Sequence, residues 1–217
     1  MRDGLATVAR AWGAMVGAVR EDHEMLHRYD EKYRTDSRAD DRTARRNGAA
    51  PALVRDLVGR IGFQMLAAYR FMRFCVDAGI PVAPQVASRL IRHAYGSDIH
   101  WEARLDPGIV VVHGMGLAVS RAARVERGAI LFQNVTLGMA IDPETRETGA
   151  PHLEPDVHVG AGSTIVGPIT LGTRSKVSAN CLLRASIPAD SLVEAPTPVI
   201  SHRLPRRVAA SLEVERQ

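Results

Sequence analysis

The sequence after Gly96 repeats with a period of six residues. Aliphatic side chains stand at every sixth position, the register moves on by two residues after Leu117, and a polar stretch from Gly138 to His152 interrupts the series. The recurring residues are Ile99, Leu105, Val111 and Leu117, then Val119, Val125, Leu131 and Leu137, then Leu153, Val159, Ile165, Leu171, Val177 and Leu183. Strands of a β-sandwich would not keep one spacing over so many steps, so the period argues for a repeat architecture.

This pattern is typical of the hexapeptide repeat, in which three hexapeptides form one triangular coil and the recurring residue points inward. Successive coils stack, and each covers the apolar layer of its neighbour. The low aromatic content of 5% suits such thin aliphatic layers. The sequence therefore predicts a left-handed parallel β-helix over residues 97–190. The polar stretch, residues 139–152, is predicted to be a loop pushed out of the solenoid, a place where function often lies.

In the first 96 residues the apolar side chains recur at the spacing of an α-helix and not at every sixth position. Apolar residues recur at helical spacing over residues 5–30, a second helix is expected from Pro51 to about Asp77, and a third is expected over residues 84–95. Residues 35–50 are rich in Arg and Asp and predict an exposed linker. We expect a helical domain over residues 1–96 and a C-terminal tail over residues 191–217.

Charge and cysteine content narrow the class of protein. The net charge of +4 is spread along the chain among 24 acidic residues, which indicates a solvated surface rather than a nucleic-acid site. Cys75 and Cys181 lie far apart and form neither a disulfide framework nor a metal-ligand spacing. No stretch is long and apolar enough for a membrane span. We expect a cytoplasmic protein that binds neither nucleic acid nor membrane.

One segment, Asp98 to Pro198, resembles the serine acetyltransferase family, and the run from Gly62 to Arg70 resembles that family more weakly. The most specific match is Asp98-Ile99-His100, followed by His113 fifteen residues after Asp98. The resemblance implies that His113 is the general base and Asp98 its acidic partner. A hydroxyl attacks a thioester well only when a base takes its proton, and histidine suits this task near neutral pH. A carboxylate on the other ring nitrogen would orient the base and stabilise the imidazolium.

The same resemblance implies acetyl-CoA as the acyl donor, with no metal. Two further segments and one residue match the family at the coils that bind the coenzyme: Val135-Thr136-Leu137-Gly138, Gly160-Ala161-Gly162, and Lys176. Gly138 and Ala161 would let the backbone approach the pantetheine arm, and Lys176 would approach its phosphate end. Backbone N–H groups near Gly138 are expected to stabilise the oxyanion. The family also implies a homotrimer or a dimer of trimers, with sites between subunits.

The sequence departs from the family where the acceptor would bind. Val112 stands where the family has an Asp before its base, Gly149-Ala150 stand where it has Arg-His, and Met139 replaces a glycine. The family's upstream Asp falls near Asn47 without a clear match. L-serine is therefore expected to be a poor acceptor, and a less polar hydroxyl or amine compound is the alternative. Arg146, Glu147 or His152 could compensate for the lost contacts.

Two other functions compete with acetyl transfer. A non-catalytic scaffold could use this fold for docking a partner, although the C-terminal sequence differs from the ending through which the family docks. A zinc-dependent enzyme like the gamma-class carbonic anhydrases could use His152 and His158, if these stacked on one face near His113 of a neighbouring chain.

Overall fold

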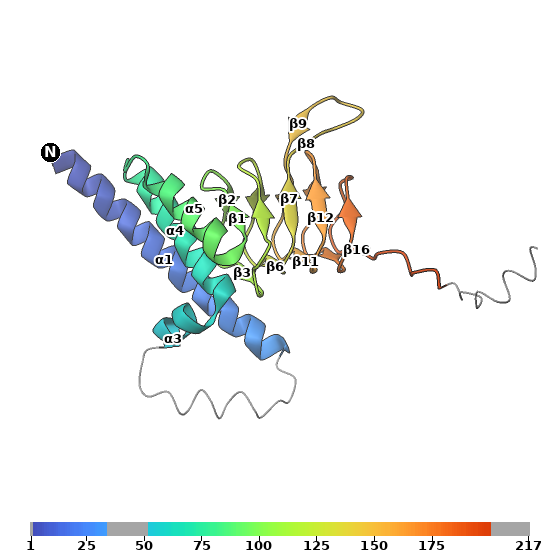
Figure 1. Ribbon diagram of the computed structural model, residues 1–217, viewed down its shortest axis with the longest axis horizontal. Helices are drawn as coiled ribbons and strands as arrows, with labels where there is room; N and C mark the ends of the chain where they lie inside the picture. The colour runs from blue at the N-terminus through green and yellow to red at the C-terminus, as the bar shows by residue number, and fades with distance from the viewer. Residues whose placement is uncertain (1, 34–51, 201–217) are drawn as a thin grey trace, which may run out of the picture.

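The computed structural model describes residues 2–33 and 52–200, and Figure 1 shows a bundle of helices at one end of a solenoid of short strands. The predicted linker over residues 35–50, the region of Asn47, and the tail beyond residue 200 lie outside the described residues. Apart from one antiparallel hairpin, the strands pair in parallel with strands one coil away and form three sheets. This arrangement confirms the predicted left-handed parallel β-helix with an N-terminal helical region.

The three sheets are the three sides of the solenoid. Sheet A contains β1 (Asp98–Ile99), β4 (Ala118–Val119), β7 (Thr136–Gly138), β12 (Thr164–Val166) and β15 (Leu182–Leu183). Sheet B contains β2 (Arg104–Leu105), β5 (Arg124–Val125), β10 (His152–Leu153) and β13 (Thr170–Leu171). Sheet C contains β3 (Val110–Val111), β6 (Ile130–Leu131), β11 (His158–Val159), β14 (Lys176–Val177) and β16 (Leu192–Val193).

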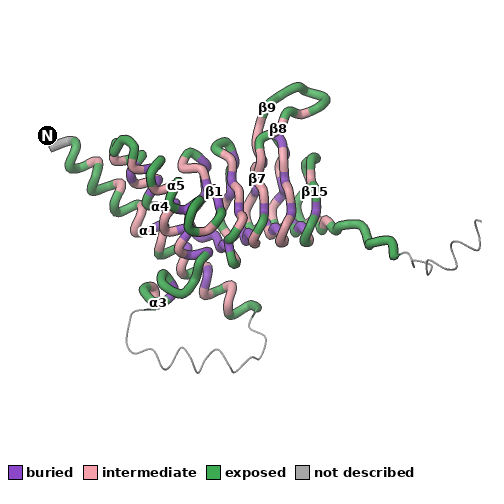
Figure 2. The backbone as a smooth tube through the Cα atoms, in the orientation of Figure 1, coloured by how far each residue is buried: buried purple, intermediate pink, exposed green. Residues whose placement is uncertain are grey.

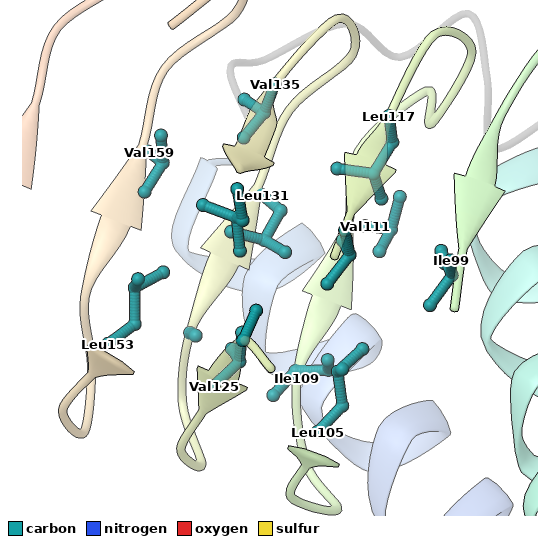
Figure 3. Packing of buried hydrophobic residues seen from close by; sticks show 14 of the residues in the cluster. Ile99, Leu105, Ile109, Val111, Leu117, Val125, Leu131, Val135, Leu153 and Val159 are labelled. Atoms are coloured by element: carbon teal, nitrogen blue, oxygen red, sulfur yellow. The ribbon is translucent and has the colours of Figure 1, made fainter. Parts of the chain in front are cut away.

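The recurring aliphatic residues fill the interior of the solenoid, and Figure 3 labels several of them together with Ile109 and Val135, which are buried beside them. Val125, Leu131, Leu137 and Leu153 have no exposed surface, and the buried positions in Figure 2 alternate with exposed ones along the strands. Burying one such side chain stabilises a fold by about 1.5–3 kcal/mol. The interior therefore consists of stacked aliphatic layers, as the period predicts.

Two insertions interrupt the eighteen-residue coil. Asp98 pairs with Ala118, twenty residues on, whereas Ala118 pairs with Thr136, eighteen residues on. The two-residue shift in the register of the aliphatic repeat thus corresponds to two extra residues at one corner of the first coil. The predicted loop is a hairpin of β8 (Ala140–Ile141) and β9 (Thr148–Gly149) that projects from the solenoid in Figure 1.

The helical region contains α1 (Arg2–Tyr33), α3 (Ala52–Gly59), α4 (Ile61–Asp77) and α5 (Ala83–Tyr95). The third predicted helix ends where Gly96 adopts a left-handed conformation and donates to Arg92 O at 3.0 Å. The second predicted helix is in fact two helices, because Arg60 is extended with φ −115° and ψ 100°. Among the described helices, none has both the length and the apolarity that a bilayer-spanning segment requires.

Helix α4 packs directly on the first coil. Tyr69, on its buried face, donates from its hydroxyl to Ala103 O at 2.7 Å and accepts from the backbone N–H of Leu105 at 3.2 Å. At its first turn, any side chain at Gly62 would collide with the carbonyl of Val111. The break at Arg60 redirects the chain so that this turn can lie against the end of β3. The helical region therefore forms one wall beside the corner that follows β3.

Candidate active site

One edge of the solenoid, where the chain passes from sheet C to sheet A, carries two of the predicted site residues. We call it the His113 edge, and its corners are His113–Gly116, Gln133–Asn134, Ala161–Gly162 and Ala179–Asn180. Successive corners are joined by backbone hydrogen bonds, from Asn134 N to Met115 O at 2.9 Å and from Gly162 N to Gln133 O at 3.0 Å. Two coils separate His113 from Ala161, which corresponds to about 10 Å along the axis at the usual strand spacing.

The corner at His113 is the enlarged one. His113 and Gly114 both have positive φ, 62° and 76°, and Gly114 lies so close to Met65 and Gly62 that a side chain would not fit. Positive φ also occurs at other corners of the solenoid, including Asn134 and Asn180 on the same edge, so this conformation belongs to the turn. The His113 side chain is exposed. The extra two residues thus present the predicted base at the surface, against the first turn of α4.

The chain brings Asp98 to the same corner. Its neighbour Ser97 is buried and donates from its hydroxyl to Gly114 O at 2.9 Å. Asp98 Oδ2 pairs with Arg92 at 2.8 Å, whereas Asp98 Oδ1 is buried without a hydrogen-bond partner. Within the described chain no hydrogen bond joins Asp98 to His113. A buried carboxylate oxygen without a partner, on the segment that meets the His113 corner, is the group that the predicted dyad needs, and the pairing itself stays a prediction.

A cavity of about 320 Å³ opens at His113. It is lined by Leu26, Tyr29, Gly59, Arg60, Ile61, Gly62, Phe63, Val111, Val112, His113 and Met115. Among these, Arg60 alone carries a permanent charge. Its guanidinium pairs with Asp30, on the same helix as Tyr29, through Nη1 to Oδ1 at 3.2 Å and Nη2 to Oδ2 at 2.5 Å. Burial, Tyr33 and Asp30 raise the pKa of Tyr29, so its hydroxyl stays a proton donor.

The sequence analysis missed Arg60 and Tyr29. The cavity joins the end of α1, the α3–α4 junction and the His113 corner, which lie far apart in the chain. No local pattern marks residues that meet only through packing. The broken helix at Arg60 was itself hidden, because the apolar spacing continues across it.

The predicted coenzyme residues lie in three different places. Ala161 is half-buried on the His113 edge, and Lys176 is exposed at the start of β14, in register with His158. Gly138 ends β7 on the opposite edge of sheet A, beside the hairpin, where a side chain would press on Val166. Packing alone thus gives one reason for glycine at this position. Within a single chain Gly138 does not meet His113.

The residues that differ from the family at the expected acceptor site also lie in different places. Val112 lines the His113 cavity, whereas Gly149 lies at the base of the hairpin, packed on Pro168. Arg146 and Glu147 are exposed in the hairpin. His152 belongs to β10 of sheet B, where its Nε2 lies 2.7 Å from Glu126 Oε1. None of the three residues that were expected to compensate for the lost contacts lines the His113 cavity.

The structural basis of the zinc hypothesis is wrong. His152 lies in sheet B, paired with Thr170, and His158 lies in sheet C, paired with Lys176. Residues six apart occupy neighbouring sides of one coil, and a side repeats only after eighteen residues. The two imidazoles therefore do not stack, and His158 lies over the ring of Phe132 instead, at 5.2 Å between centroids.

Comparison with known proteins identifies relatives of one kind. The serine acetyltransferase of Synechococcus elongatus is 34% identical over 134 residues, which are 61% of this chain and 53% of that protein. The chain spans about half the length of the curated relatives it matches. No family model matches the chain.

Solved structures agree in fold. A serine acetyltransferase from Entamoeba histolytica, solved in complex with cysteine, has a TM-score of 0.70 at 19% identity, covering 96% of this chain and 68% of its own. A serine acetyltransferase solved in complex with CoA has a TM-score of 0.67 at 20% identity, with coverage of 92% and 75%. The chain is thus similar in sequence to serine acetyltransferases and shares the fold of their solved structures.

Proposed function

We propose that this protein transfers the acetyl group of acetyl-CoA to the hydroxyl of a small molecule, serine or a related hydroxy acid. The observation that carries the proposal is one corner, at which Ser97, the neighbour of Asp98, bonds to Gly114, the neighbour of His113. His113 is exposed in a cavity there, and Asp98 has a buried carboxylate oxygen without a partner. The names of the relatives favour serine as the acceptor. A scaffold without activity would not need this combination of groups.

His113 is the general base in this proposal. It takes the proton of the acceptor hydroxyl as the oxygen attacks the thioester carbon, and the new C–O bond forms. Asp98 accepts the N–H of the other ring nitrogen and stabilises the imidazolium. When the C–S bond breaks, His113 returns the proton to the departing thiolate. His113 thus both accepts and returns the proton, and no metal is needed for the step.

The donor would lie along the His113 edge. Ala161 lies on that edge two coils from His113, and its small side chain leaves the corner open to the pantetheine arm. Lys176 is exposed one coil further on and offers an ammonium to a phosphate. Gly138, on the opposite edge of sheet A, would complete the site from a neighbouring copy in a homotrimer or a dimer of trimers. Backbone N–H groups near Gly138 would then face the oxyanion across that interface.

The acceptor would lie in the cavity at His113. Arg60 is the cationic group there, and a guanidinium matches a carboxylate in geometry, so the carboxylate of the acceptor would displace that of Asp30. Tyr29 offers a hydroxyl, while Val112 and Phe63 form apolar walls. The cavity therefore suits an acceptor that has a hydroxyl and a carboxylate. We assign to Arg60 the role of the charged residues missing at positions 149 and 150.

A panel of acceptors tests the proposal, with acetyl-CoA as donor and release of free thiol as the signal. Serine, 3-hydroxypropionate, serinamide and ethanolamine differ in the ammonium and the carboxylate. We expect the two carboxylates to be preferred, and Arg60→Ala to raise their KM at least tenfold with little change in the KM for acetyl-CoA. Arg127→Ala, at an exposed arginine on a different edge, is the matched control. Thiol release that no acceptor stimulates would reject the proposed activity.

A further inference from the structure

Two histidines and an aspartate converge between α1 and α3, away from the His113 edge. His23 and His27 lie one turn apart on α1, so their side chains share a face. Asp56 is a buried residue of α3. The ligand-type atoms of the three side chains all lie within 4.8 Å of one another, and no other such group occurs among the residues that the structure describes.

The distances between these atoms match the edges of a zinc coordination polyhedron. His23 Nε2 lies 2.9 Å from Asp56 Oδ2 and 3.2 Å from His27 Nε2, and His27 Nε2 lies 3.4 Å from Asp56 Oδ2. Zinc binds imidazole nitrogen and carboxylate oxygen at about 2.0–2.2 Å in tetrahedral geometry, which places neighbouring ligand atoms about 3.3 Å apart. The three atoms thus form one face of a tetrahedron.

Hydrogen bonding alone cannot account for all three contacts at once. A neutral imidazole nitrogen carries either a proton or a lone pair. If His23 Nε2 donates to Asp56, it has no lone pair left to accept a proton from His27 Nε2, which faces Asp56 Oδ2 at 3.4 Å instead. Only one of the contacts around His23 Nε2 can be a normal hydrogen bond. A cation at the centre would receive a lone pair from each of the three atoms.

The surroundings support a bound cation. The side chains of His23 and Asp56 are 13% and 8% exposed, and that of His27 is 44% exposed, so the site is closed on one side and open to water on the other. The ring of Phe63 packs on His23, with centroids 5.3 Å apart. Arg55 Nε, 3.5 Å from Asp56 Oδ1, holds the second carboxylate oxygen and leaves Oδ2 for the centre. Outer contacts of this kind orient metal ligands.

We propose that His23, His27 and Asp56 bind a zinc ion, with water in the fourth position. Two imidazoles and one carboxylate form a ligand set that zinc accepts readily. The ion would fasten α3 to α1 just before the chain turns at Arg60 into α4. Because Arg60 and Phe63 line the cavity at His113, zinc would also hold one wall of that cavity in place.

Zinc binding by the full-length protein tests the proposal directly. After treatment with a chelator, the protein is titrated with zinc alone in competition with a chromophoric chelator, and we expect one zinc per chain. Changes to residues around a metal ligand weaken binding by about 10–100-fold, so His27→Ala, which removes a ligand, is expected to weaken it at least as much. His93→Ala, at an exposed histidine on α5, is the matched control and should bind as the wild type does.

Two further measurements separate a metal site from a merely structural cluster. Cobalt in place of zinc should give the strong visible absorption of a tetrahedral site, absent in His27→Ala. Zinc should raise the Tm of the wild type and of His93→Ala but not that of His27→Ala, because a ligand stabilises only a fold that binds it. His27 is half-exposed, so its loss should leave the fold intact. Failure of the wild type to bind zinc, or equal binding by His27→Ala, would overturn the proposal.

Discussion

Arg70 of α4 and Asp22 of α1 form a buried bidentate ion pair, with Nε–Oδ2 at 2.9 Å and Nη2–Oδ1 at 3.0 Å. Both charges have further partners. Arg70 donates to the carbonyls of Leu105 and Asp106, and Asp22 accepts the N–H groups of Gly108 and Ile109 at 2.9 and 3.2 Å. One pair of side chains thus joins two helices to the first coil.

Asp22→Asn should destabilise the fold strongly. The change leaves the Arg70 guanidinium buried without a counter-charge, and breaking a buried pair in this way destabilises by about 3–5 kcal/mol. Asp77→Asn removes the partner of Arg73 in a far more exposed pair and should change stability by less than about 1 kcal/mol. Urea denaturation of the two variants measures the difference. Equal stabilities would mean that the buried pair does not hold the helices to the solenoid.

His113→Ala should abolish transfer and leave the binding of acetyl-CoA nearly unchanged. General-base catalysis contributes about 10²–10⁴-fold, and turnover should fall by that factor. Asp98→Asn should reduce it less, because the base itself remains. His93→Ala controls for the loss of an imidazole elsewhere. Turnover of His113→Ala within threefold of the wild type would rule out this base.

Stability should rise with pH just below neutrality because of His158. Burial, Lys176 and Lys32 lower the pKa of His158 below its ordinary value of 6.5. The unfolded chain therefore binds a proton more readily than the folded chain between the two pKa values, and stability increases with pH over that window. The contribution is complete above pH 6.5 and is lost as the pH falls through the folded pKa.

Urea denaturation at several pH values, with wild type and His158→Gln, measures this effect. Besides the two lysines, the ring contacts of His158 are with Phe132 and Tyr33. We expect a shallower pH dependence in His158→Gln and an unchanged one in His93→Gln. Parallel curves for all three proteins would contradict the assignment.

Light scattering should detect a trimer or a dimer of trimers at micromolar concentration. Leu5 and Trp12 on α1 and Leu90 on α5 are 69%, 53% and 64% exposed in the single chain, which leaves apolar surface for other copies. A monomer would contradict the prediction, and it would also remove the means by which Gly138 reaches the site.

The six-residue period was sufficient to predict the solenoid because each recurring side chain points into the same interior. Ile99, Leu105 and Val111 occupy the three sides of one coil, and all are buried. The two-residue shift in the period also marked the corner that carries His113, although its geometry, with positive φ at two successive residues, could not be read from the spacing.

What depends on contacts between distant segments could not be predicted in this way. The helix from Pro51 breaks at Arg60, and Gly62 then lies against Val111, a residue about fifty positions away. The spacing of His23 and His27 suggests a shared helix face, but only the fold brings Asp56 to it. The stacking of His152 and His158 was predicted wrongly because one side of the coil recurs after eighteen residues, not six.

Serine should be recognised weakly at its ammonium group. Val112 lines the cavity, and no acidic side chain lines that cavity in the described part of the chain, so the ammonium has no carboxylate partner there. A hydrogen bond to a charged group contributes about 1.5–3 kcal/mol, which corresponds to roughly 10–150-fold in kcat/KM at about 1.4 kcal/mol per decade. We therefore expect kcat/KM for serine below about 10⁴ M⁻¹s⁻¹, the lower end of the usual enzyme range.

Steady-state kinetics of wild type and Val112→Asp measure this directly. The added carboxylate should raise kcat/KM for serine about tenfold or more and should lower it for 3-hydroxypropionate, which has no ammonium and would meet a repelling charge. Val112→Asn, similar in size but neutral, controls for shape and should improve neither acceptor by that factor. A wild-type kcat/KM for serine above 10⁴ M⁻¹s⁻¹ would mean that another group holds the ammonium. In that case Asp30, beside Arg60, is the first residue to replace.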